Sequence, residues 1–307
     1  MTDKELQERC LPTPYNYRIV YHSSEQYGFG IILRKMFFFP KWLPICAHFE
    51  HSSPPFYDKM WKLNHQFLKY VFFHRRDYVT QWNAENNSKA FQFMSPFVWY
   101  KQKEKIKISK EAKGSVFFIS HSSETFDNVV NEEKIMDTVA NLDSEFHPVT
   151  FCFYFVDVQK NAHLRYQEKG FNIVTVGHRD SPYFIKNFYE TIKEYKFMLT
   201  NSIGGHLLFG TNLGMPVSYL NNLEPKQMVD EEYEKTVLKT FNTDITPNKA
   251  KALFKGIHKT VTKEQLEFVN TMLGLKKPIS RLKGSWILYV SLIYYMIFKI
   301  KKVKNAK

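Results

Sequence analysis

The sequence predicts an α/β protein built around a parallel sheet. Between residues 114 and 220, apolar runs alternate with amphipathic stretches of about ten residues, which is the spacing of strand–helix–strand units. The expected buried strands are Val116–Ser120, Val149–Val158, Phe171–Val176, Phe197–Thr200 and Val217–Leu220. The expected helices between them are Glu132–Leu142, Gln159–Lys169, Ser181–Tyr195 and His206–Leu213.

The region before residue 105 has weaker patterning. Ile31–Ile45 is apolar and aromatic around prolines, and Tyr57–Phe73 has the spacing of a helix with an aromatic face. Lys101–Lys113 is highly charged and is typical of a linker. A chain of 307 residues is long enough for two domains, each with its own core. The expected divisions are an N-terminal acceptor-side α/β domain over 1–105, a Rossmann-like domain over 106–280 and a tail over 281–307.

Composition narrows the classes of partner. The chain has 43 Lys+Arg against 30 Asp+Glu, a formal net charge of +13, and 17% aromatic residues, a balance that suits nucleic acid or an anionic membrane. Neither zinc-finger spacing nor an aromatic-and-basic RNA-binding signature occurs, so no nucleic acid is expected as a partner. Cys10, Cys46 and Cys152 are far apart and form no C-x-x-C, so we expect no metal site, no disulfide framework and a cytoplasmic location.

The C-terminal segment differs from the rest of the chain. Trp286–Phe298 reads WILYVSLIYYMIF and carries no charge. The segment 281–307 has basic residues and no Asp or Glu; the basic residues are Arg281, Lys283, Lys299, Lys301, Lys302, Lys304 and Lys307. The apolar run is too short to span a bilayer. It predicts a helix lying in the headgroup region of an anionic surface, at the inner face of the cytoplasmic membrane. The alternative is a final helix packed back onto the body.

The most informative motif is Asn201-Ser202-Ile203-Gly204-Gly205-His206, which follows a predicted strand and opens a predicted helix. We expect Ser202 to cap the helix and the paired glycines to let the backbone approach a ligand. The helix N-terminus would then offer free N–H groups to an anion. The motif is neither G-x-G-x-x-G nor a P-loop. An ordinary tight turn is the alternative.

Two further loops follow predicted strands. His121, Ser122 and Ser123 come after the first strand, with a helix cap as the alternative interpretation. Gly177 and Arg179 come after the third, where a guanidinium suits phosphate and an Arg179–Asp180 surface pair is the alternative. Because the carboxyl ends of parallel strands share one edge of a sheet, we expect these loops to converge on one anionic ligand.

The stretch NSIGGHLLFGTNLGMPVSYL resembles the nucleotide-sugar-binding region of GT-B-fold glycosyltransferases, especially bacterial enzymes of O-antigen, capsule and lipopolysaccharide assembly. The resemblance covers roughly Gly114–Leu220. It implies two Rossmann-like domains facing a cleft, a nucleotide-sugar donor, and a glycan or lipid-linked acceptor. The paired-glutamate motif of some GT-B families is absent, so sugar contacts are not carried over. No Asp-x-Asp occurs, and a metal-independent reaction without a cofactor is expected.

A transferase of this kind needs a base for the acceptor hydroxyl, and the resemblance implies an acidic residue or a histidine in an N-terminal loop. His51 or Glu50 is expected to serve, with His48 and Asp58 as nearby rivals and a buried structural His51 as the alternative. The segment 74–77, His-Arg-Arg-Asp, is expected to be a solvated basic face, with contact to a charged acceptor or lipid as the alternative. Other readings of the whole chain are a non-catalytic basic module for membrane or nucleic acid, or a transferase of another phosphorylated group.

Overall fold

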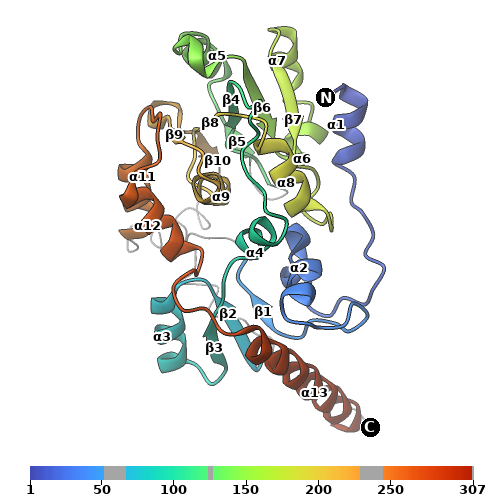
Figure 1. Cartoon of the computed structure of the whole chain (residues 1–307). Helices are drawn as coiled ribbons and strands as arrows, with labels where there is room; N and C mark the ends of the chain where they lie inside the picture. Colours follow the sequence, from blue (N-terminus) through green and yellow to red (C-terminus); the bar gives the residue numbers. More distant parts are fainter. Residues whose placement is uncertain (52–66, 124–126, 229–244, 306–307) are drawn as a thin grey trace.

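The computed structural model describes residues 1–51, 67–123, 127–228 and 245–305. Two parallel sheets lie one above the other along the long axis of the molecule (Figure 1). The larger has the strand order β7-β6-β4-β8-β9 and the smaller has the order β1-β2-β3. The prediction of an α/β protein with a parallel sheet is therefore confirmed.

The strands of the larger sheet lie in the predicted apolar runs. They are β4 (Ser115–Phe118), β6 (Val149–Phe153), β7 (Asn172–Thr175), β8 (Phe197–Thr200) and β9 (Val217–Tyr219). All neighbouring strands of this sheet are parallel. Every residue of β4, β6 and β8 is buried, which is why these strands read as continuous apolar runs. β6 ends at Phe153, before the predicted Val158, because helix α6 begins at Phe155.

Helices cover the larger sheet, and its strand order creates a switch point. The helices that accompany it are α5 (Glu132–Ala140), α6 (Phe155–Gln159), α7 (Leu164–Glu168), α8 (Phe184–Ile192), α9 (Gly205–Leu213), α11 (Ile245–Phe254) and α12 (Lys263–Met272). The chain runs outward from β4 through β6 to β7 and then returns to place β8 and β9 on the other side of β4. In open α/β sheets, ligands bind where the strand order reverses, which here is the crevice between the carboxyl ends of β4 and β8.

The smaller sheet is built from short strands. Its elements are β1 (His48–Phe49), β2 (Tyr70–Phe73), β3 (Lys89–Gln92), α2 (Phe29–Met36), α3 (Arg76–Glu85) and α4 (Pro96–Lys103). The predicted helix over Tyr57–Phe73 is wrong at its end, where Tyr70–Phe73 forms the central strand; residues 57–66 lie outside the described part. A strand buried on both faces is a run of aromatics, and periodicity alone does not separate it from a buried helix.

An aromatic layer joins the two sheets. Phe97 of α4 stacks on Phe209 of α9 with ring centroids 3.7 Å apart, and it meets Phe188 of α8 edge-on at 5.4 Å. These rings belong to one buried cluster that contains residues from both sheets. The Lys101 ammonium donates to the carbonyl of Asn212 at the end of α9, at 2.6 Å. The arrangement of the two sheets is therefore fixed by a continuous apolar core.

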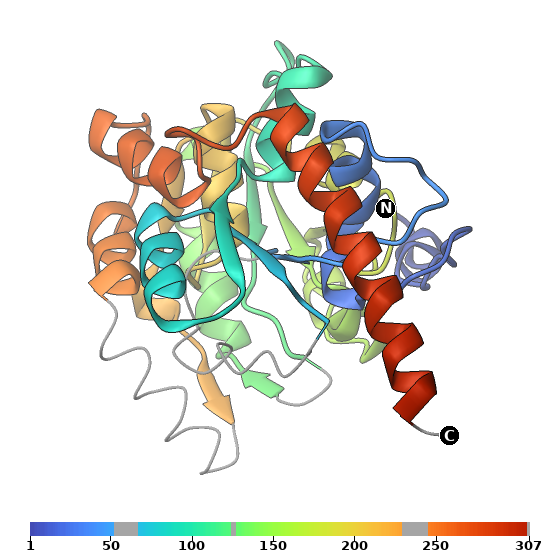
Figure 2. The same cartoon turned by 90° about the horizontal axis from the view of Figure 1, so that it is seen from below.

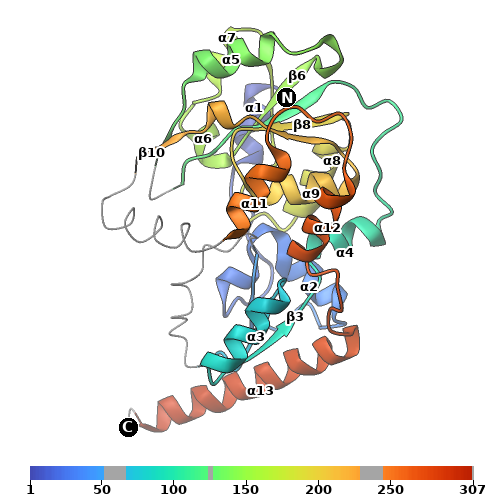
Figure 3. The same cartoon turned by 90° about the vertical axis from the view of Figure 1, so that its left-hand side faces the viewer.

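The two chain ends cross between the halves. α1 (Asp3–Arg9) packs beside β7 and α6 of the larger sheet, and Asp3 lies 2.8 Å from the buried His163. α13 (Arg281–Asn305) returns to the smaller sheet and lies along its outer side (Figure 3). The Arg281 guanidinium Nε donates to the Met36 carbonyl at the end of α2, at 2.7 Å. The predicted boundaries at 105 and 280 stay predictions.

Smaller elements complete the fold. β5 (Asp127–Val129) pairs antiparallel with β10 (Lys226–Met228), and single 3-10 turns are η1 (His22–Ser24), η2 (Gln26–Gly28), η3 (Ser144–Phe146) and η4 (Asn221–Leu223). Within the described ranges no helix combines the length and the apolarity needed to cross a membrane. Cys10, Cys46 and Cys152 are buried free thiols.

Candidate active site

The loops after β4 and β8 meet at the switch point and are tied together by Asn201. Its side-chain oxygen accepts from the backbone N–H of Ser120 at 2.7 Å. Its amide nitrogen donates to the Ser120 hydroxyl at 3.1 Å and to the Leu223 carbonyl at 3.0 Å. Asn201 is fully buried, so its polar atoms are used within the protein. It positions the two loops, whereas the sequence suggested a ligand contact.

His206 lies beside this tie, at the start of α9. Its Nε2 is 2.9 Å from the Thr200 hydroxyl, which itself donates to the Ser202 carbonyl at 3.0 Å. Because the single hydroxyl proton is used there, Nε2 must be the donor, and the neutral ring keeps Nδ1 as an acceptor. The ring stacks on Phe118 at 4.9 Å, and burial lowers the pKa of His206 to about 3, with a further lowering from the charge of His121. His206 is therefore neutral at physiological pH.

The turn into α9 differs in detail from the prediction. Gly204 is the N-cap residue and no side chain caps the helix, so the expected cap by Ser202 is wrong. Ser202 instead donates its backbone N–H to the Thr200 hydroxyl at 3.1 Å. Gly204 has an extended backbone, and a Cβ there would lie 3.0 Å from the His206 ring. A Cβ on Gly205 would lie 3.1 Å from the Phe209 ring, so packed rings account for both glycines.

The N-terminus of α9 presents unused donors. Within the described residues, the backbone N–H groups of Ile203, Gly204, Gly205 and His206 make no hydrogen bond. These residues are half-buried and stand at the carboxyl edge of β8. The first N–H groups of a helix carry a partial positive charge, and together they bind an anion.

The loop after β4 carries an exposed side chain, His121, and a buried one, Ser122. His121 is exposed, and its ring lies 4.2 Å from that of Tyr154. Ser122 is buried: its backbone N–H donates to the Asp157 carboxylate at 3.2 Å, and its hydroxyl accepts from the backbone of Asn128 at 3.2 Å. Ser123 is half-buried. Burial raises the pKa of Asp157, and the bonds from Ser122 oppose that rise. His121 is thus the group of this loop that faces outward beside α9.

The loop after β7 connects the two halves. Gly177 has a φ of +104°, and a Cβ there would lie 2.8 Å from the carbonyl oxygen of Arg9, so the close approach of α1 requires this glycine. The backbone carbonyl of Arg179 accepts from the N–H of Tyr27 at 2.6 Å. Asp180 lies 3.1 Å from the ring of His22. The loop therefore belongs to the interface, and the charge of Arg179 acts on His51 of the smaller sheet's half.

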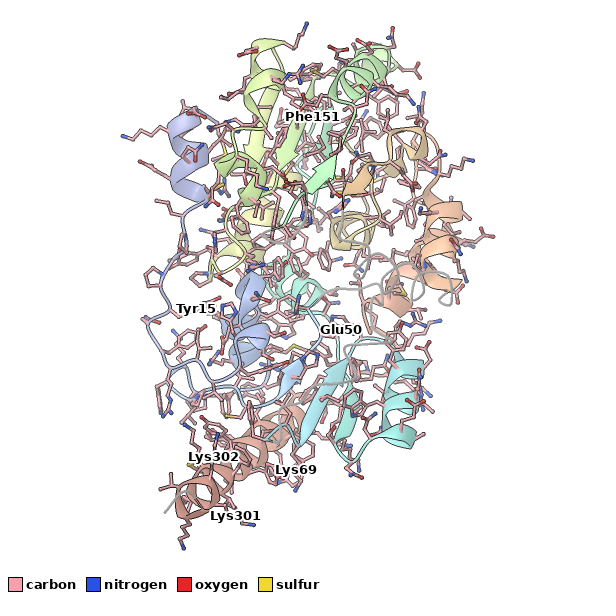
Figure 4. All side chains as sticks on the ribbon, turned by 180° about the vertical axis from the view of Figure 1, so that it is seen from behind. Tyr15, Glu50, Lys69, Phe151, Lys301 and Lys302 are labelled. Atoms are coloured by element: carbon pink, nitrogen blue, oxygen red, sulfur yellow. The ribbon has the colours of Figure 1, made fainter. Side chains whose placement is uncertain are left out.

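Glu50 and His51 follow β1 on the opposite side of the interface. Glu50, labelled in Figure 4, lies at the edge of the smaller sheet that faces the larger one. It is 2% exposed, and one carboxyl oxygen accepts from the backbone N–H of His74 at 2.6 Å. Burial raises the pKa of Glu50 to about 8, although the bond from His74 opposes the rise. A carboxyl group of this kind is largely protonated at neutral pH.

His51 is half-buried and faces the larger sheet. Its Nδ1 lies 3.4 Å from the Ser23 hydroxyl, and its ring centroid is 5.4 Å from that of Tyr27. Burial lowers the pKa of His51 to about 4, and the charges of Arg179 and His22 lower it further. Arg179, from the larger sheet's side of the interface, therefore acts on this ring. The rival His48 is buried against the Tyr21 hydroxyl at 3.1 Å, and Asp58 lies outside the described residues.

Sequence reasoning missed His74. It was expected in a solvated basic face, yet it is 2% exposed, with its ring stacked on Phe93 at 4.3 Å. Burial lowers the pKa of His74 to about 4. The sequence feature that could have indicated its position is that His74 directly follows the apolar run Tyr70–Phe73, because residues at the carboxyl ends of parallel strands lie at the edge where ligands bind.

The described residues include no group of three or more His, Cys, Asp or Glu that could hold a metal ion. No family model matches the chain, and no curated protein matches it. Among solved structures, the chain is similar to the crystal structure of UDP-GlcNAc 2-epimerase from Neisseria meningitidis bound to UDP-GlcNAc, with a TM-score of 0.36 and 11% sequence identity. The similarity covers 74% of this chain and 62% of that chain, so this chain spans less than two thirds of that enzyme.

Proposed function

We propose that the protein is a glycosyltransferase that passes a sugar from a nucleotide-sugar donor to a glycan or lipid-linked acceptor in cell-surface polysaccharide synthesis. The observation that carries the proposal is that an edge of the larger sheet with free N–H donors faces an edge of the smaller sheet with titratable side chains. The unused N–H groups at the start of α9 lie at the switch point of the larger sheet, and titratable residues follow β1 and β2 on the facing edge. A two-domain glycosyltransferase of the GT-B kind divides its work in this way.

The donor diphosphate is assigned to the turn Ile203–His206. Free N–H groups and the helix dipole stabilise the negative charge that grows on the departing phosphate, and no metal is needed for that role. Arg179 supplies a positive charge near the same edge. We assign His121 to the nucleotide, and its exposure in the neighbouring loop supports that assignment.

The acceptor is activated from the smaller sheet. A base takes the proton of the acceptor hydroxyl, the oxygen forms a bond to the anomeric carbon, and the bond from that carbon to the diphosphate breaks. The nucleoside diphosphate leaves with the electron pair. His51 is the first choice because it is neutral at physiological pH and lies near enough to Arg179 for the charge of that residue to act on its ring. Glu50 is the second choice, since a pKa of about 8 gives a strong base once the carboxyl is ionised.

Peripheral attachment to the inner face of the cytoplasmic membrane is part of the same proposal. Lipid-linked acceptors are displayed at that surface, and the segment 281–307 combines apolar and basic residues without an acidic one. The enzyme and its lipid-linked acceptor would then be confined to the same membrane surface, which raises the rate at which they encounter each other.

Thermal unfolding with added nucleotides tests donor binding. A ligand at about 100 times its Kd stabilises the folded state by about 2.7 kcal/mol, a shift of a few degrees for a chain of this size. We expect one of UDP, GDP or CMP to raise the midpoint and the others to have little effect. Salt-sensitive binding of an oligonucleotide with no nucleotide effect would instead support a non-catalytic nucleic-acid module. Equal stabilisation by inorganic pyrophosphate alone would favour a transferase of another phosphorylated group.

A further inference from the structure

Helix α13 has two faces of different character. The inward face packs on the smaller sheet's half through Gly284, Ile287, Leu288 and Ser291, which are buried. The Ser291 hydroxyl donates to the Ile287 carbonyl at 2.8 Å, so this face leaves no polar group of that residue unpaired. A Cβ at Gly284 would overlap the ring of Phe37. The first half of the helix is therefore held firmly against the body.

The opposite face is apolar and exposed along its whole length. Leu282 is 76% exposed, Trp286 60% and Ile300 57%. Most exposed apolar residues of the helix lie about one turn apart on one side, while the exposed Tyr294 lies on another; those on the one side are Leu282, Trp286, Tyr289, Ile293, Met296, Ile297, Ile300 and Val303. We call this set the α13 stripe. A stripe of this length exceeds the scattered apolar residues of an ordinary surface.

A second element extends the stripe. The turn after α2 presents Phe38, 56% exposed, and Trp42, 74% exposed. The Arg281 guanidinium lies 3.8 Å from the centre of the Phe38 ring. The ring of the adjacent Phe39 is 5.1 Å from that of Tyr289. Seen from below, α13 crosses this face of the molecule in the foreground (Figure 2). The contacts of Arg281 with Phe38 and of Tyr289 with Phe39 place the turn beside the first half of the helix.

Positive charge borders this apolar surface. α13 contains Lys283, Lys299, Lys301, Lys302 and Lys304 and no acidic residue, and all of these lysines are exposed. Lys35 and Lys41 flank the turn and are exposed as well. Lys69 lies 5.4 Å from the ring of Tyr294, and Figure 4 shows Lys69, Lys301 and Lys302 at the same end of the molecule. A surface of this composition complements an anionic one that also accepts hydrocarbon.

An apolar surface bordered by lysines fits an anionic membrane better than it fits nucleic acid or a second copy of the chain. Nucleic acid would use the lysines but would leave Leu282, Ile293 and Ile300 against water or phosphate. A second copy of the chain would bring two rows of lysines together without an acidic residue on α13 to pair with them. An anionic bilayer takes up the apolar side chains, while the lysines reach its headgroups.

We propose that α13 and the turn Phe38–Trp42 form one docking face that lies flat on an anionic membrane. The α13 stripe and the two rings enter the boundary between headgroups and acyl chains, and the lysines contact the headgroups. This inference rests on the proposed peripheral attachment and is independent of the transfer reaction. A failure to bind vesicles would leave donor binding and transfer to a water-soluble acceptor untouched.

Co-sedimentation of the full chain with vesicles tests the docking face. Vesicles of phosphatidylcholine alone are compared with vesicles that also contain phosphatidylglycerol. We expect binding to the anionic vesicles only, and at least a tenfold loss of affinity in Trp286→Glu/Ile293→Glu. The matched control is Leu266→Glu, an exposed apolar residue of α12 that should leave binding unchanged. Each of Lys301→Gln and Lys304→Gln should weaken binding about fivefold.

Trp42→Ser tests whether the turn Phe38–Trp42 contributes to docking or whether α13 binds the membrane alone. If the turn contributes, this variant should bind vesicles several-fold more weakly. Quenching of tryptophan fluorescence by brominated lipid should fall in Trp286→Phe and in Trp42→Phe. Equal binding of Trp286→Glu/Ile293→Glu and the parent protein would overturn the proposal. A dimer in sedimentation that this double variant converts to a monomer would overturn it in favour of a second copy. Oligonucleotide binding that depends on the lysines alone would overturn it in favour of nucleic acid.

Discussion

The two sheet edges that face each other differ in the chemistry they present. The edge of the larger sheet offers backbone N–H groups at α9, the neutral ring of His206 and loops locked by Asn201. The edge of the smaller sheet offers titratable side chains with shifted pKa values, Glu50 and His51. Fixed dipoles bind the donor diphosphate and stabilise the charge that grows on it as it departs, whereas proton transfer needs groups that titrate. Changes at the first edge should therefore alter donor affinity as well as rate, and changes at the second should alter rate alone.

The largest expected effect is on turnover. His51→Ala should lower kcat by about 10²- to 10⁴-fold, the usual contribution of a general base, while the donor Kd stays constant. With His51 as the base, kcat should be flat from neutral to alkaline pH and fall only as the pH approaches about 4. With Glu50 as the base, kcat should rise as the pH increases through about 8. Steady-state kinetics across pH distinguish the two.

The matched control is His147→Ala, which changes an exposed histidine at the amino end of β6. It should keep full activity. If Glu50→Gln and His51→Ala both retain the kcat of the parent protein, the smaller sheet's edge does not supply the base. The proposed division of roles between the two edges is then wrong.

The second effect concerns acid stability. His206 and His74 are buried with folded-state pKa values of about 3 and about 4, below the ordinary value of 6.5. As the pH falls below 6.5, the unfolded chain binds protons that the folded chain does not, so the free energy of unfolding decreases until the folded pKa is reached. Glu50, with its pKa raised to about 8, acts in the opposite sense, because its contribution is lost as the pH rises from 4.5 toward 8.

Urea unfolding at pH 7 and pH 5 measures this window. On going from pH 7 to pH 5, each buried histidine should lower the free energy of unfolding by on the order of 2 kcal/mol. His206→Gln keeps a donor for Thr200 and does not titrate, so its loss of stability on acidification should be smaller by that amount. His147→Gln should behave like the parent protein. An acid dependence that is unchanged in His206→Gln would mean that His206 is not held neutral.

The smallest of the three effects is on donor affinity. Gly205→Asp places a carboxylate in the first turn of α9, where it competes with phosphate, and the Kd for the preferred nucleotide should increase at least tenfold. Gly205→Ala is the control, because it adds the Cβ near Phe209 without the charge. An acidic residue in the first turn favours the helix itself, so the midpoint of unfolding should not fall further than in the alanine variant. Calorimetric titration with equal Kd values for both variants would argue against an anion at this turn.

Sequence reasoning was accurate where strands are buried on both faces. β8 matches its predicted range Phe197–Thr200, and β9 differs from its range only at Leu220. Such strands are continuous apolar runs bounded by polar loops, so their ends are marked in the sequence. The loops that carry His121, Arg179 and Gly205 could therefore be found in advance.

The smaller sheet could not be read in the same way. β1 has only two residues, and β3 (Lys89–Gln92) has the mixed composition KAFQ. The roles of single residues also depend on distant partners. Gly177 is required by Arg9 of α1, and the position of His74 beside the arginines of its own segment concealed its burial against Phe93. No local pattern encodes these contacts, because the partners are brought together only by the fold.

The crossing of distant segments has a consequence for biosynthesis. α1 emerges from the ribosome well before β7, beside which it packs, and the smaller sheet's half emerges well before α13, which packs against Phe37 and the end of α2. Ile287 and Leu288 of α13 belong to the same buried cluster as Phe37, so the core of the smaller sheet's half cannot close until these residues have been made. Until then the ring of Phe37 and the apolar side chains around it stay accessible to solvent and to chaperones.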